Sequence, residues 1–204
     1  MNSPKPKKRK GSFYTPKQVK ELLKAFEGTD LELPIALAVL TGLRRGEILG
    51  LRYSDIDFEN KTISIRQQLV EVNKHLFFDE PKSDESKRNI IIPDNLLLLL
   101  KMEKERKETN ISSFGENYKD QDLVVCKPNG EPIKPKSFSR KFGTELKEKG
   151  LKPIRFHDLR HSCASLMLSA GVPLKVTSEI LGHSTISITA DLYSHVISEQ
   201  KKDA

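Results

Sequence analysis

Residues 31–51 have the sequence LELPIALAVLTGLRRGEILGL, a long apolar run followed by a glycine and two arginines. Residues 33–43 are apolar nearly all round, which predicts a helix buried at the centre of a domain. The Thr41-Gly42 pair interrupts that pattern and lets the backbone turn. A short helix over residues 45–51 is expected next, so Arg44 should lie at the turn, beside a cavity rather than in open solvent.

Helices and a small amount of β-structure surround this central segment. Thr15 followed by Pro16 predicts an N-cap and the first position of an amphipathic helix over residues 16–27. The residues DFENKTISIRQ predict a strand, a turn and a strand, and a second hairpin is expected around the polar segment DEPKSDESKR, with strands at 75–78 and 89–92. Further helices are expected at 94–107, 135–148, 157–170, 174–181 and 185–197, and a short strand at 122–126. The pattern predicts an α+β domain, mainly helical with a small antiparallel sheet.

The composition limits the classes of function. The chain has 204 residues, 36% of them hydrophobic, which is enough for one sizeable domain. No apolar run approaches the roughly 20 residues that cross a bilayer, and no apolar signal segment follows the first methionine. Two cysteines, Cys126 and Cys163, fit a reduced cytosolic protein better than a disulfide scaffold. The net charge of +7 favours nucleic acid over a membrane surface as partner, although charge alone fits a basic soluble enzyme equally well.

Residues 1–12 form a different kind of segment. Their sequence, MNSPKPKKRKGS, has prolines and basic residues but almost nothing to bury, so we expect a disordered linker or arm. The basic residues are similar to a nuclear localisation signal, but patches of this size also follow DNA phosphates, and we favour that interpretation. The residues expected to contact phosphates are Lys5, Lys7, Lys8, Arg9 and Lys10.

The segment HDLRH is predicted to place two basic residues on one helix face. His157 and Arg160 are three residues apart, so both can reach one phosphate. The planar fork of Arg160 suits two phosphate oxygens. A zinc site is the alternative, because His157 and His161 have the spacing of two ligands on an H-E-x-x-H helix. That motif needs a glutamate and a third ligand, and Arg160 between the histidines would repel a cation.

The segment LGHS predicts a helix end, with Gly182 as the C-cap and His183 directly after it. Tyr193 follows ten residues later, in the segment LYSH. Taken alone, Tyr193 is more simply explained as a half-buried aromatic side chain with a satisfied hydroxyl.

Two charged residues elsewhere are further candidates. Glu47 follows Arg44 by three residues, a spacing that lets its carboxylate hold the arginine by hydrogen bonds. Lys82 lies in the turn expected for the second hairpin, where lysines are usually solvated. Lys87 lies in the same segment, so the choice between the two lysines stays open.

Together and in this order, these segments resemble the catalytic domain of the tyrosine recombinases, also called phage-type integrases. The matching segments are TGLRRGE, EPKSDESKRNIIIP, HDLRH, LGHS and the tyrosine near the end of the chain, over roughly residues 13–197. Each motif is common by itself, but the ordered set is specific. The resemblance implies the DNA breaking-rejoining fold for a catalytic domain over residues 13–204. It also implies an enzyme that cuts and rejoins DNA to integrate or excise a phage or mobile element.

The resemblance assigns the bond-breaking roles to four residues. Tyr193 matches the nucleophile that attacks the scissile phosphodiester, giving a 3′-phosphotyrosyl link and a free 5′-hydroxyl. Arg44 and Arg160 match the pair that clamps the non-bridging oxygens. Lys82 matches the hairpin lysine that protonates the leaving 5′-oxygen.

Three more residues receive supporting roles from the same resemblance. His157 matches a general acid or base at the nucleophile, and His183 matches a position that hydrogen-bonds the phosphate and is tryptophan in some relatives. Glu47 matches an acid that supports the site. The chemistry implies no metal and no cofactor, because preorganised cations stabilise the growing negative charge.

The implied partner is double-stranded DNA, on which the chain would form a dimer or tetramer, with accessory DNA-bending factors as further partners and no membrane. The expected location is the bacterial cytosol or nucleoid. Such recombinases commonly carry an upstream helical domain, so we expect an excised catalytic fragment rather than a minimal relative. The alternatives are a DNA-binding regulator that lacks the chemistry, a type IB topoisomerase and, less favoured, a zinc hydrolase.

Overall fold

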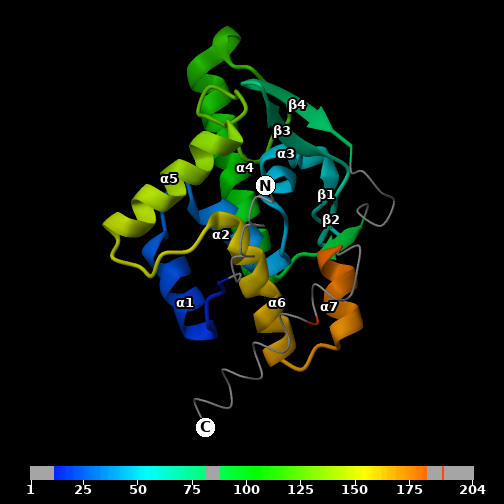
Figure 1. The fold of residues 1–204 in the computed structure, drawn as a ribbon. Coiled ribbons are helices and arrows are strands. Elements are labelled where there is room, and N and C mark those ends of the chain that lie inside the picture. Colours follow the sequence, from blue (N-terminus) through cyan, green and yellow to red (C-terminus); the bar gives the residue numbers. More distant parts are fainter. Residues whose placement is uncertain (1–11, 81–87, 183–189, 191–204) are drawn as a thin grey trace, which may run out of the picture.

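The computed structural model describes residues 12–80, 88–182 and 190, and its helices surround one apolar segment (Figure 1). Helix α2 (Glu32–Thr41) lies at the centre, and most of its side chains are buried. It contacts α1, α4 and α6. The remaining helices, in chain order, are α1 (Pro16–Ala25), α3 (Arg45–Gly50), α4 (Asp94–Phe114), α5 (Pro135–Glu148), α6 (Leu159–Ser169) and α7 (Leu174–Leu181), with single 3-10 turns at Tyr53–Asp55, Gly115–Asn117 and Phe156–Asp158.

Several helices begin and end where the sequence predicts. Thr15 caps α1 by accepting a hydrogen bond from the backbone of Gln18, and Pro16 occupies the first turn. Helices α5 and α7 have the predicted bounds. Helix α4 runs seven residues beyond the predicted end at 107, to Phe114. No helix among the described residues is long and apolar enough to cross a bilayer.

The β-structure differs from the prediction in how its strands pair. Strands β1 (Ile56–Asp57) and β2 (Thr62–Ser64) form the predicted first hairpin, and β2 also pairs antiparallel with β5 (Asn89–Ile91). Strand β4 (His75–Asp79) pairs instead with β3 (Gln68–Val72) in a separate two-stranded sheet. The predicted hairpin of 75–78 with 89–92 is therefore wrong.

A two-residue turn explains the actual pairing. Asn73 and Lys74 join β3 to β4, and both have a positive φ, of 49° and 69°. Two consecutive residues of that kind form the tight turn that matches the twist of a hairpin. The predicted strand at 122–126 is also wrong, because only isolated bridges occur there, between Arg52 and Leu123 and between Cys126 and Pro132.

Close backbone contact fixes α3 against β3. A Cβ placed on Gly50 would lie 2.8 Å from the backbone nitrogen of Leu69, so only glycine allows this approach. The side-chain amide of Gln67 also donates to the carbonyl oxygen of Gly50 at 2.6 Å. The last residue of α3 is thereby held against β3, and the same short helix carries Arg44 at its N-cap.

Candidate active site

Arg44 is the N-cap residue of α3 and is bound to a carboxylate of the same turn. Its backbone N–H donates to Oε2 of Glu47 at 2.7 Å, and its Nη1 donates to Oε1 at 2.7 Å. Glu47 is only 4% exposed, and its charge lies at a helix N-terminus, where the partial positive charge stabilises it. The contact that the spacing predicts is present. The Arg44 side chain is 32% exposed, so it lies at the edge of the core, neither in open solvent nor enclosed.

Arg160 lies on the first turn of α6 and joins three helices. Its side chain is almost completely buried, at 3% exposure. Nη1 donates to the carbonyl oxygen of Gly42 at 2.6 Å, and Nη2 donates to that of Leu181. Gly42 ends α2 in the left-handed conformation, with φ 69°, and so turns its carbonyl toward the arginine. The predicted Thr-Gly break is confirmed, and it ties the end of α2 to the start of α6.

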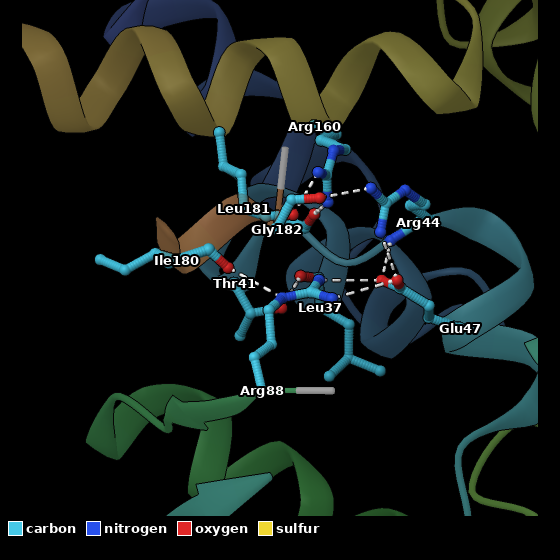
Figure 2. Close-up of polar contacts among 10 residues, drawn as sticks. Leu37, Thr41, Arg44, Glu47, Arg88, Arg160, Ile180, Leu181 and Gly182 are labelled. Carbon is cyan, nitrogen blue, oxygen red and sulfur yellow. Dashed lines mark hydrogen bonds and ion pairs between the residues drawn. The ribbon is translucent and has the colours of Figure 1, made fainter. Parts of the chain in front are cut away.

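The C-terminal end of α7 meets arginines from three parts of the chain (Figure 2). The carbonyl oxygen of Ile180 accepts from Arg88 Nε at 2.9 Å, and that of Gly182 accepts from Arg44 Nη2 at 2.6 Å. The carbonyl of Leu181, between them in sequence, accepts from Arg160. The last carbonyls of a helix have no intrahelical partner and carry partial negative charge, so they suit guanidinium donors. Gly182 has the left-handed conformation predicted for the C-cap, with φ 61°.

Arg88 is the third arginine at the end of α7 and forms a cluster with Arg44 and Arg160, although its position in the sequence does not suggest this. Its Nη1 and Nη2 donate to Oε1 and Oε2 of Glu47 at 3.1 and 3.0 Å. The Arg88 side chain is only 8% exposed. An arginine directly before a strand is usually solvated. The only sequence signal for a role in the site is that Arg88 lies in the matching segment EPKSDESKRNIIIP.

The cluster carries an excess of positive charge. Arg44, Arg88 and Arg160 surround the single carboxylate of Glu47. Burial would raise the pKa of Glu47, but the hydrogen bonds and charges of Arg88 and Arg44 outweigh it, so the pKa is lowered. Burial, and then the charge of Arg44, lowers the pKa of Arg160 to about 9. A site with surplus guanidinium charge and little solvent suits an anion such as a phosphodiester.

Two histidines lie beside Arg160. His157, in the 3-10 turn before α6, is exposed, whereas His161 is half-buried, and their ring centroids are 5.8 Å apart, edge to face. Desolvation lowers the pKa of both, and the charges of His161 and Arg160 lower that of His157 further. The lowered pKa favours the neutral form of both imidazoles.

The zinc alternative lacks a third ligand within the described residues, where no group of three His, Cys, Asp or Glu side chains could hold a metal. The acid between the two histidines, Asp158, is buried at 1% exposure and bound twice by Arg155, both times at 2.7 Å. It is thus committed to an ion pair and does not take the role of the glutamate that the zinc motif needs.

The described part of the chain brings together Arg44, Glu47 and Arg160, with His157 next to Arg160. Lys82, His183 and Tyr193 lie outside the described residues, as do the five basic residues of the arm at 5–10. Chain connectivity still relates two of them to the cluster, because His183 directly follows Gly182 and Lys82 lies six residues before Arg88.

Comparisons with known proteins give the family. The model of the phage integrase family matches residues 12–200. A "Tyrosine recombinase XerC-like" protein of Caldanaerobacter subterraneus subsp. tengcongensis is 34% identical over 94% of this chain and 52% of its own length. The ICEBs1 integrase of Bacillus subtilis is 30% identical over 96% of this chain and 54% of its own length. The chain therefore spans about half the length of these curated relatives.

Solved structures agree with the fold. The Tn1549 transposon integrase in complex with transposon right end DNA superposes with a TM-score of 0.79 at 25% identity, covering 92% of this chain and 62% of that one. XerA recombinase superposes with a TM-score of 0.73 at 20% identity, over 94% of this chain and 64% of that one. The mainly helical α+β architecture is thus that of tyrosine recombinase catalytic domains. Because the family model matches nearly the whole length of this chain, residues 12–200, the chain belongs to the phage integrase family.

Proposed function

We propose that this chain cleaves and rejoins double-stranded DNA through a covalent 3′-phosphotyrosine at Tyr193, as the catalytic domain of a site-specific recombinase that integrates or excises a phage or mobile element. The observation that carries the proposal is the arginine cluster at the end of α7, where the partly exposed Arg44 and the buried Arg160 come together beside one carboxylate. Surplus positive charge of this kind stabilises the negative charge that grows on a phosphodiester under attack.

The two arginines keep donors for a phosphate. A guanidinium has five N–H groups. The contacts of Arg160 with described residues engage one N–H at Nη1 and one at Nη2, both with backbone carbonyls. Those of Arg44 engage one N–H with Glu47 and one with Gly182. Each arginine is therefore fixed in orientation by the protein and still able to bind non-bridging oxygens.

The other roles are those that the resemblance to the tyrosine recombinases implies. His157 is the proton acceptor or donor at Tyr193, Lys82 protonates the leaving 5′-oxygen, and His183 donates a hydrogen bond to the phosphate. The covalent link conserves the energy of the broken bond, so rejoining needs no ATP and no cofactor. The basic arm, Lys5, Lys7, Lys8, Arg9 and Lys10, adds phosphate contacts, and a dimer or tetramer forms on the DNA.

The three other tyrosines support Tyr193 as the nucleophile. Tyr14, Tyr53 and Tyr118 all lie in the described residues, and burial raises the pKa of each hydroxyl. Tyr14 also donates to the carbonyl of Lys152. A tyrosine must lose its proton to attack phosphorus, and a raised pKa opposes that step.

A covalent-capture experiment tests the proposal. A library of random-sequence duplexes, each carrying a nick that lets the cleaved fragment escape, traps the phosphotyrosyl adduct, which is seen by denaturing electrophoresis and mapped by mass spectrometry. The wild-type chain should form an adduct at Tyr193, and Tyr193→Phe should bind DNA without one. Tyr118→Phe serves as the matched control and should behave as wild type. An adduct at another residue, or DNA binding with no adduct in the wild type, contradicts the proposal; the second result would leave a DNA-binding regulator.

A further inference from the structure

Arg88 connects Glu47 to the end of α7 and has a role that no motif assigns. Like Arg44, which contacts Glu47 and the carbonyl of Gly182, Arg88 contacts both Glu47 and the end of α7, in its case through Ile180 (Figure 2). These partners lie 41 and 92 residues away in sequence. The inference drawn from this geometry rests on the proposed DNA cleavage.

The side chain of Arg88 lies directly against the C-cap of α7. A Cβ placed on Gly182 would lie 3.2 Å from both Cδ and Nη1 of Arg88, tighter than ordinary contact. Glycine is favoured at position 182 by its positive φ, and any larger residue would also push Arg88 aside by a few tenths of an ångström. The fit means that the position of α7 and the position of Arg88 depend on each other.

The Glu47 carboxylate is held from two sides. Oε1 accepts from Arg44 Nη1 at 2.7 Å and from Arg88 Nη1 at 3.1 Å. Oε2 accepts from the Arg44 backbone at 2.7 Å and from Arg88 Nη2 at 3.0 Å. Because Arg88 approaches with a planar two-point contact, it fixes the plane of the carboxylate. That plane sets the direction in which Arg44 is held.

We propose that Arg88 is a positioning residue of the DNA-cleaving site. It orients Glu47, and through it Arg44. It also anchors Ile180, so that the next two carbonyls of α7 align on Arg160 and Arg44. Arg88 does not itself bind the scissile phosphate, because all three of its guanidinium nitrogens already donate, Nε to Ile180 and Nη1 and Nη2 to Glu47.

Loss of Arg88 has a specific consequence for Arg44. Glu47 is 4% exposed, so without Arg88 its carboxylate would have Arg44 as its remaining cationic partner among the described residues. Without the two-point contact of Arg88 the carboxylate can rotate, and Arg44, which is bound to it at 2.7 Å, would turn with it and away from the phosphate. The effect should appear in the cleavage step more than in DNA affinity.

The test compares Arg88→Lys with a buried cation elsewhere. Arg88→Lys keeps the charge but loses the two-point contact, so single-turnover cleavage at saturating DNA should fall by about 10²-fold, as for a misplaced catalytic group. The dissociation constant for DNA should change by less than about threefold, because the phosphate contacts proposed for the other basic residues remain. The matched control is Lys107→Met, which removes a cation 8% exposed and paired with Asp120 at 2.9 Å, in a contact outside the arginine cluster. It should lower the melting temperature and leave the cleavage rate of the folded protein near wild type.

Three results overturn the proposal: Arg88→Lys cleaves at the wild-type rate, its DNA affinity falls as much as its cleavage rate, or Lys107→Met loses cleavage equally at matched folded fraction. If Arg88→Lys does not fold, a measurement on the wild-type protein tests the proposal instead. The ¹⁵N resonance of the Arg88 Nε–H should stay protected from solvent exchange when DNA binds, and loss of protection would show that Arg88 moves to the DNA. Absence of any adduct from the wild type is a separate result, which contradicts the proposed function rather than the role of Arg88.

Discussion

Arg160 donates to the carbonyl oxygen of Gly42 at 2.6 Å, a bond that joins residues 118 positions apart and ties α6 to the end of α2. The same guanidinium reaches the carbonyl of Leu181. A side chain assigned to phosphate binding thus also closes the packing of three helices. Function and stability are coupled at this residue.

Arg160→Lys should therefore lower both the cleavage rate and the free energy of unfolding. Lysine keeps the charge but has no planar fork, so cleavage should fall by about 10²-fold or more, as for loss of one oxyanion donor. The backbone carbonyls of Gly42 and Leu181 lose a donor pair, so the free energy of unfolding should fall by about 1–3 kcal/mol. Single-turnover cleavage and urea denaturation measure the two effects. Wild-type cleavage in the variant would remove Arg160 from the site.

Gly42→Ala should destabilise the protein through a clash as well as through backbone strain. Gly42 has φ 69°, and an added Cβ would overlap Cδ2 of Leu181 and lie 3.3 Å from Sγ of Cys163. Gly28 is the matched control, because it has φ 73° and nothing within 4 Å of an added Cβ. Gly28→Ala should cost about 1 kcal/mol, the strain alone.

Gly42→Ala should cost clearly more than Gly28→Ala in urea denaturation, and should slow cleavage because the end of α7 shifts from Arg160. Equal losses of unfolding free energy in the two variants would mean that α7 moves away from the added Cβ at no cost. Its carbonyls would then not hold the arginines in place.

The sequence predicts elements whose signals are local and misses contacts that are not. Helix α1 has its cap and proline within four residues, and α7 ends at a glycine that needs a positive φ. The β3–β4 hairpin is missed because its turn uses Asn73 and Lys74 rather than glycine. Arg88 is missed because its partners are 41 and 92 residues distant, and no spacing along one element reveals them.

Glu47 should make stability depend on pH at the acid side. Its folded pKa is lowered, so the ionised form stabilises the fold above the unfolded pKa of about 4.3. That contribution is lost as the pH falls from about 5 through the lowered pKa. Glu47→Gln should flatten the acid limb of a stability profile measured by urea denaturation between pH 3 and 7.

The exposed pair of Lys127 and Glu131, 2.7 Å apart, is the control for this titration. Its charges are screened by solvent, so Glu131→Gln should change the acid limb little, and less still at high salt. If Glu131→Gln and Glu47→Gln flatten the profile equally, the buried arginine cluster has no special role in it.

The final prediction decides between Lys82 and Lys87 as the general acid. A lysine that protonates the leaving 5′-oxygen is needed only when that oxygen leaves as a strong base, and its loss should slow cleavage by about 10²–10⁴-fold. A substrate with sulfur at the bridging 5′ position needs no proton, because a thiolate is a far weaker base than an alkoxide. Lys82→Ala should therefore be slow on the oxygen substrate and near wild type on the sulfur substrate, in single-turnover assays.

Two controls accompany this assay. Lys87→Ala should cleave both substrates at the wild-type rate, whereas Arg160→Lys should be slow on both, since its defect lies in stabilising the non-bridging oxygens and not in the leaving group. Rescue of Lys87→Ala by sulfur would move the assignment to Lys87. A Lys82→Ala defect that persists on the sulfur substrate would show that Lys82 acts on the phosphate oxygens, as a fourth cation beside the three arginines that meet at the end of α7.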